Sequence, residues 1–148
     1  MIVLSALVPL SGVPDALSEA LQWDASTDEE VLAGHVLRVH RDWLNGGLEQ
    51  ALSNLREIEE PIEPYIAAYQ LIGLCEAADL VQEAAIGADG RDVTDAKWEG
   101  LDDRYSLLTY GEGGDQPDAI EKAVVQFAQS WPEQFRVSVE QANAVLAG

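Results

Sequence analysis

The N-terminal half of the chain contains a long stretch in which apolar residues recur at helical spacing. Thr27 is followed three positions later by Glu30, which is the spacing of a capping box at a helix N-terminus. The stripe that follows consists of Val31, Leu32, His35, Val36, Val39 and Trp43. Recurrence every three or four residues is typical of a helix with one buried face. The pattern therefore predicts a helix over residues 27–44.

This helix is expected to end at Asn45-Gly46-Gly47, because Asn and Gly adopt the left-handed conformation that closes helices. The two glycines allow a tight turn, and the side chains of Asn45 and Gln50 can hydrogen-bond backbone groups left free at the two helix ends. A second helix is predicted from Leu48. Its apolar stripe is Leu48, Ala51, Leu52 and Leu55.

The rest of the chain repeats this periodicity between breaks at proline and glycine. Gly73 is expected to separate two helices. Further helices are predicted over residues 65–74, 76–86, 98–108, 118–131 and 132–146, with a loop over residues 87–94. We therefore predict an all-α fold, in which residues 1–148 form one compact domain of about seven or eight helices without a sheet.

Acidic residues are concentrated in one region. The chain has 27 Asp and Glu against 8 Lys and Arg, a formal net charge of −19 over 148 residues. Residues 57–122 hold seventeen of the acids and four of the bases, a net of −13. Such a surface favours solubility and the capture of cationic partners. Because 47% of the residues are apolar, a disordered acidic tail is disfavoured and a folded core is expected.

The cysteine content and the apolar runs predict the compartment. Cys75 is the single cysteine, which excludes an internal disulfide, and its neighbours Leu74 and Ala77 indicate a buried thiol. The apolar residues 1–13 lack a basic segment and contain Pro9, so we expect no signal peptide. No apolar run reaches the roughly 18 residues that a membrane span requires. A cytoplasmic location is expected.

Residues that could bind a metal are few. His35 and His40 are five positions apart and point to different sides of a helix, so they do not form an i, i+4 metal pair; we expect His35 to be partly buried and His40 to lie on the surface. Asp89, Gly90 and Asp92 resemble the start of a calcium loop, but the later ligands are out of register. We expect neither a metal nor a cofactor.

Catalytic residues are also not evident. The glycine-rich loop at residues 111–117 contains acids that would repel a phosphate. Asp102 and Asp103 are adjacent carboxylates, but no nucleophile accompanies them, and we expect them to cap a helix or to pair with Arg104. A deep pocket lined by Asp102, Arg104 and Tyr105 would instead indicate an enzyme. We expect the protein not to be an enzyme.

Several segments, taken in order, resemble the bacterial DNA-mimic protein family. They are Trp43-Leu-Asn-Gly-Gly-Leu-Glu-Gln50, Ala67-Ala-Tyr-Gln-Leu-Ile-Gly73, Leu101-Asp-Asp-Arg-Tyr105 and Trp131-Pro-Glu-Gln-Phe135. The first contains the Asn-Gly-Gly-x-x-Gln junction formed by Asn45, Gly46, Gly47 and Gln50, but Leu48 stands where an aromatic residue is usual and Ala51-Leu52 replaces an aromatic pair. The resemblance spans residues 30–136. It implies an all-helical fold whose acidic surface imitates the phosphates of duplex DNA.

The charge pattern supports the same interpretation independently. DNA-binding proteins meet regularly spaced phosphates with Lys and Arg, and helices can present carboxylates at about 5–6 Å intervals. We predict a basic protein partner, such as a transcription factor or a nucleoid protein, and no direct binding to nucleic acid or membrane. The predicted partner-binding acids are Glu57, Glu59, Glu60, Glu63, Glu76, Asp79, Glu83, Asp89, Asp92, Asp95, Glu99, Asp102 and Asp103.

Two alternatives stay open at the level of sequence. An acidic helical domain can inhibit a basic toxin such as a nuclease, as an immunity protein or antitoxin, and such an inhibitor would depend on a few buried hot-spot residues. Alternatively, the charge only keeps the domain soluble, in which case the acids need not share a face. The arrangement of the acids in space bears on this choice.

Overall fold

The computed structural model describes residues 2–3, 21, 25–90 and 94–137. The helices are α2 (Asp28–Glu57), α3 (Glu63–Ile72), α4 (Cys75–Gly90), α5 (Asp95–Tyr110) and α6 (Ala119–Ser130). The described part of the chain also contains one antiparallel pairing of the two-residue strands β1 (Ile2–Val3) and β2 (Arg136–Val137). The all-helical class is confirmed, but with five helices in the described residues in place of the seven or eight predicted.

Helix α2 begins as the sequence predicts. The backbone N–H of Glu30 donates to Thr27 Oγ1 at 3.1 Å, and the backbone N–H of Thr27 donates to Glu30 Oε1 at 3.2 Å. Both bonds of the capping box are therefore formed. The Thr27 hydroxyl also lies 3.1 Å from the backbone oxygen of Gln134, and this contact brings the chain after α6 to the start of α2.

The Asn-Gly-Gly junction divides α2 into two segments. Gly47 has φ 83° and ψ 179°, which is not helical, and Leu48 follows it as the first buried residue of the second segment. The backbone N–H of Leu48 donates a hydrogen bond to Asp102 Oδ1 of α5 at 2.8 Å. Gln50, expected to bond a backbone group, instead donates from Nε2 to Asn54 Oδ1 at 2.7 Å. The predicted break is confirmed, but a carboxylate from a distant helix caps it.

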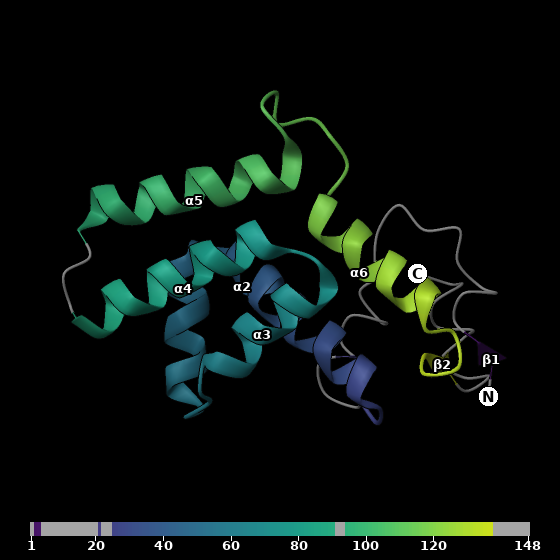
Figure 1. Cartoon of the computed structure of the whole chain (residues 1–148). Helices are drawn as coiled ribbons and strands as arrows, with labels where there is room; N and C mark the ends of the chain where they lie inside the picture. Colours follow the sequence, from purple (N-terminus) through teal and green to yellow (C-terminus); the bar gives the residue numbers. More distant parts are fainter. Residues whose placement is uncertain (1, 4–20, 22–24, 91–93, 138–148) are drawn as a thin grey trace.

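The core lies around α2, which contacts each of the other four helices. Figure 1 shows α3 and α4 packed against α2, with α5 running beside α4 and α6 near the paired strands. The largest fully buried side chains include three tyrosines and a phenylalanine: Tyr65, Tyr69, Tyr105 and Phe135. Buried tyrosines need hydrogen-bond partners for their hydroxyl groups, and this requirement shapes the interior described below.

Three local predictions are wrong. Helix α4 continues to Gly90, and Ala88 still packs against the core, so residues 87–90 of the predicted loop are helical; residues 91–93 of that loop lie outside the described residues. Pro132 begins a turn closed by the bond from Gln134 N to the Trp131 carbonyl, and β2 follows, so no helix starts there; residues 138–146 of that predicted helix lie outside the described residues. Cys75 is exposed, because Ala77 and Ala78 take the inward positions of the first turn of α4.

Candidate partner-binding surface

The structure exposes most of the acids that the sequence predicts to bind a partner. Asp102 is half-buried, because its carboxylate is the acceptor for Leu48 N–H. The side chain of Asp89 and the whole of Asp92 lie outside the described residues. The exposed ones are Glu57, Glu59, Glu60, Glu63, Glu76, Asp79, Glu83, Asp95, Glu99 and Asp103.

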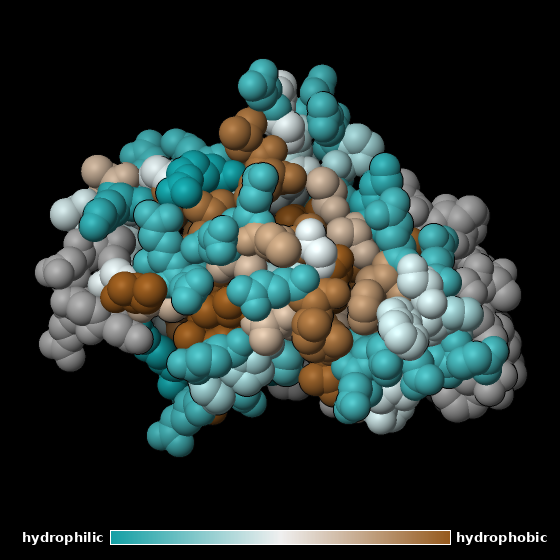
Figure 2. Space-filling model, in the orientation of Figure 1, coloured by the Kyte–Doolittle hydropathy of each residue, from teal (hydrophilic) through white to brown (hydrophobic). Residues whose placement is uncertain are grey.

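Helices α4 and α5 run antiparallel, side by side, on one face of the molecule (Figure 1). The acids of α4 border a groove between the two helices, which Glu76, Asp79 and Glu83 line from one side and Arg104 from the other. Arg104 Nη1 donates to Glu83 Oε2 at 3.0 Å across this groove. In Figure 2, hydrophilic side chains lie over both helices, with hydrophobic surface visible between them.

The acids of α5 fall on its other side. Helical periodicity places Asp95 and Glu99 near the side of Asp102, which faces α2, and opposite Arg104, with Asp103 between the two sides. The acids of the α2–α3 turn form a third group, in which Glu60 and Glu63 border a hollow that also contacts Ala85 of α4. The predicted acids therefore occupy three neighbouring groups. The α4 group borders the groove between α4 and α5.

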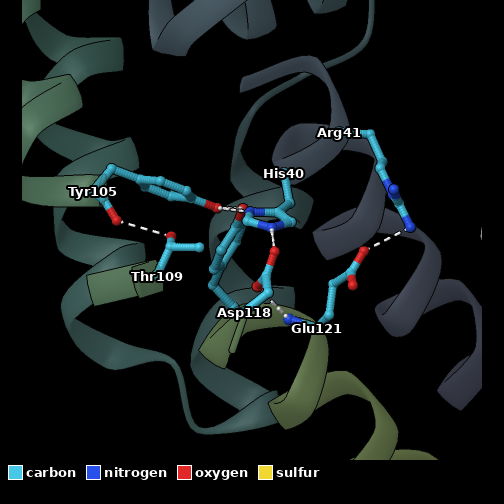
Figure 3. Close-up of polar contacts among 7 residues, drawn as sticks. His40, Arg41, Tyr105, Thr109, Asp118 and Glu121 are labelled. Carbon is cyan, nitrogen blue, oxygen red and sulfur yellow. Dashed lines mark hydrogen bonds and ion pairs between the residues drawn. The ribbon is translucent and has the colours of Figure 1, made fainter. Parts of the chain in front are cut away.

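A buried chain of polar side chains joins four helices behind this surface. His40 of α2 lies between Tyr105 of α5 and Asp118 at the start of α6, as Figure 3 shows. Its Nε2 is 2.6 Å from Asp118 Oδ2, and its Nδ1 is 3.0 Å from the Tyr105 hydroxyl. That hydroxyl is in turn 2.7 Å from the hydroxyl of Tyr69 on α3. We call this set, Tyr69–Tyr105–His40–Asp118, the tyrosine–histidine chain.

The charge states of the chain follow from burial and hydrogen bonding. Burial raises the pKa of both tyrosine hydroxyls, which therefore stay protonated. Burial alone would raise the pKa of Asp118, but the bonds from His40 and from the backbone N–H of Glu121 outweigh it and lower that pKa. The Asp118 carboxylate can only accept, so in a neutral ring Nε2–H donates to it and Nδ1 accepts from Tyr105.

The tyrosine–histidine chain holds the helices together and is not accessible to a substrate. His40, Tyr69 and Tyr105 are each 0% exposed, and His40 was predicted to lie on the surface, which is wrong. His40 follows Val36 and Leu37 by four and three positions, so it belongs to their buried stripe. That spacing was the signal that could have located it, and the Asp118-x-x-Glu121 capping spacing was the signal for its partner.

The three residues that the sequence offered for an enzyme pocket do not lie together in the structure. Asp102 points to Leu48, Tyr105 is buried in the tyrosine–histidine chain, and Arg104 lies in the groove, so the three do not share a pocket. Within the described ranges, no group of three or more His, Cys, Asp or Glu side chains could hold a metal ion. In the same residues, no helix has both the length and the apolar character needed to cross a membrane.

We expect acid to destabilise the fold through His35. Its ring packs against that of Tyr65 with the centroids 4.2 Å apart and the planes tilted by 31°, and burial lowers its pKa below the ordinary 6.5. The unfolded chain then binds a proton that the folded chain does not, so stability is lost as pH falls below that ordinary value. Thermal melting at about pH 7 and about pH 5 should show a larger loss for the wild type than for His35→Gln, and the comparison cancels the effects of the surface carboxylates. Equal losses would contradict the prediction.

Comparison with known proteins identifies the family. The family model described as DMP19-like protein matches residues 24–135, which include all five helices and the junction at Gly47. No curated protein and no solved structure matches the chain. Because the family match covers most of the sequence, the chain belongs to the DMP19-like protein family, a family of DNA-mimic proteins.

Proposed function

We propose that this protein is a DNA mimic that occupies the basic DNA-binding surface of a protein partner, such as a transcription factor or a nucleoid protein. The observation that carries the proposal is the exposed carboxylates of α4 and its neighbours on a scaffold of the DMP19-like family. A basic DNA-binding groove binds duplex DNA largely through charge, with release of counterions. A fixed array of carboxylates competes for the same Lys and Arg side chains.

The rigidity of the scaffold supports this role. Helix α4 presents Glu76, Asp79 and Glu83 at positions separated by three and four residues, so their carboxylates form a row. The buried tyrosine–histidine chain and the cap from Asp102 fix the helices behind that row. Preorganised charge loses less conformational entropy when a partner binds than the same charge on a disordered tail.

We propose that the protein acts by binding and not by catalysis. An immunity-type inhibitor of a basic toxin is the alternative, and it would rely on a few central aromatic anchors. In the acid-rich residues 57–122, Tyr65, Tyr69 and Tyr105 are buried, and Trp98 and Tyr110 are half-buried, so no aromatic side chain of this range is fully exposed. The arrangement favours distributed charge and hence the mimic.

Paired charge variants test this function. We expect Glu76→Gln with Asp79→Asn to weaken capture of basic proteins from the source lysate by roughly three- to tenfold at low salt, because each lost charge pair contributes up to about 1 kcal/mol. Asp28→Asn with Glu49→Gln removes the same charge from exposed positions on α2 and should change capture by less than about twofold. Equal effects of the two pairs would show that only net charge matters.

A further inference from the structure

The groove between α4 and α5 has an apolar floor inside an acidic rim. One part of it has a volume of about 310 Å³ and is lined by Leu80, Leu107 and Leu108 together with Glu76 and Asp79. Leu107 is 49% exposed, although it lies in the most acidic region of the chain. Leu107 shares this hollow with Leu80 and Leu108, so one apolar side chain from outside can contact leucines of both helices.

A cationic side chain of the protein itself, Arg104, lies in this groove. Arg104 lines both this leucine-lined part and the neighbouring part next to Gly100, and it pairs with Glu83 at 3.0 Å. The two side chains are 58% and 57% exposed, so water screens the pair and its contribution to stability is small. A cation from outside can therefore replace the Arg104 guanidinium at Glu83.

We propose that this groove receives a segment of the cationic partner in which one apolar side chain is flanked by Lys or Arg. The apolar side chain enters between Leu80, Leu107 and Leu108, and the flanking cations contact Glu76, Asp79 and Glu83. Arg104 is displaced from Glu83 when the segment binds. The identity of the partner rests on the proposed function. Binding of a basic segment in the groove can be tested without any competition by DNA.

Charge complementarity selects this occupant. A second copy of the chain would bring another net charge of −19 against the acidic rim, which disfavours self-association at this face. A small cation would use the carboxylates but would leave the leucine floor uncovered. A basic segment with one apolar anchor satisfies both the rim and the floor, and apolar anchors seated in pockets dominate binding energy at protein interfaces.

Two short synthetic peptides test the apolar anchor. Both are Lys-rich, and they differ only in a central Leu or Ser. By fluorescence anisotropy, the Leu peptide should bind the full chain roughly five- to tenfold more tightly than the Ser peptide. Leu107→Ser should abolish this preference, whereas Ile86→Ser, which changes an apolar residue of α4 that is 67% exposed and outside the groove lining, should keep it. Equal binding of both peptides to the wild type would overturn the proposal.

A second pair of variants tests the displacement of Arg104. Arg104→Gln and Lys122→Gln each remove one exposed positive charge from the same chain. We expect Arg104→Gln to strengthen binding of the Leu peptide by about threefold and Lys122→Gln to have a much smaller effect, because Arg104 lines the groove and pairs with Glu83, whereas Lys122 is not among the lining residues. Equal strengthening by both would show that net charge alone governs binding.

The two proposals can fail separately. If the peptides discriminate as expected but duplex DNA does not compete with the natural partner, the groove stands and mimicry fails. If DNA competes but Leu107→Ser leaves the peptide preference intact, mimicry stands and the groove is not the docking site.

Discussion

Asp118→Ala should lower the free energy of unfolding by about 3–5 kcal/mol. The carboxylate pairs with His40, which is 0% exposed, at 2.6 Å, and it also accepts from the backbone N–H of Glu121 at 2.9 Å as the N-cap of α6. Its removal leaves the buried imidazole N–H of His40 without an acceptor and removes a helix cap, and the first effect costs the most. Urea unfolding followed by circular dichroism measures the loss. Since a domain of this size is stable by only about 5–15 kcal/mol, the variant should be marginal.

Two further variants separate the causes. Asp118→Asn keeps a good N-cap and a neutral acceptor for His40, so we expect it to cost only about 1–2 kcal/mol. Asp115→Ala removes an exposed acid from the same loop and should change stability by less than about 0.5 kcal/mol. If Asp118→Ala changed the free energy of unfolding as little as Asp115→Ala, the tyrosine–histidine chain would not hold α6 to α2.

Gly47→Ala should cost about 3–5 kcal/mol, although it adds only one methyl group. Gly47 has φ 83° and ψ 179°, a conformation essentially confined to glycine, and an added Cβ would lie 2.7 Å from Asp102 Oδ2. The methyl group must displace the carboxylate that accepts from Leu48 N–H, so a buried donor loses its acceptor as well. Equilibrium unfolding in urea gives the magnitude.

Gly100→Ala is the matched control for this change. Gly100 lies within α5, and an added Cβ there meets no atom within 4 Å. Alanine is the better helix former, so this variant should be more stable than the wild type by about 0.5–1 kcal/mol. The two Gly→Ala changes thus have opposite predicted signs. A small effect at Gly47 would mean that the junction can adopt another conformation without loss.

The sequence predicts those features of the fold that depend on neighbouring residues. The capping box at Thr27, the break at Gly47 and the break at Gly73 are encoded within a few positions, and all three are found. The all-helical class follows from the 3.6-residue period, which does not depend on how the helices pack. The prediction that a helix begins at Pro132 is wrong, because contacts such as the bond between Thr27 and Gln134 depend on residues far apart in the sequence.

The interior and the site depend on contacts between distant residues, which the sequence does not encode locally. His40 and Asp118 are separated by 78 positions, and Leu48 and Asp102 by 54, so neither bond could be predicted from local pattern. Exposure of the acids was predictable, since charged residues are seldom buried. Their division into three groups depends on how α4 and α5 pack, and so does the groove around Arg104.

Competition with duplex DNA shows directly whether the protein occupies the DNA-binding surface of a partner. The immobilised protein is exposed to lysate of the source organism at about 50 mM salt, and bound proteins are eluted with duplex DNA or with about 500 mM salt; steep salt dependence is expected when charge dominates affinity. If the protein is a DNA mimic, it should capture a specific basic DNA-binding protein, and both duplex DNA and high salt should release that protein from it. Capture of a protein that neither DNA nor salt releases, or no specific capture at all, would contradict DNA mimicry.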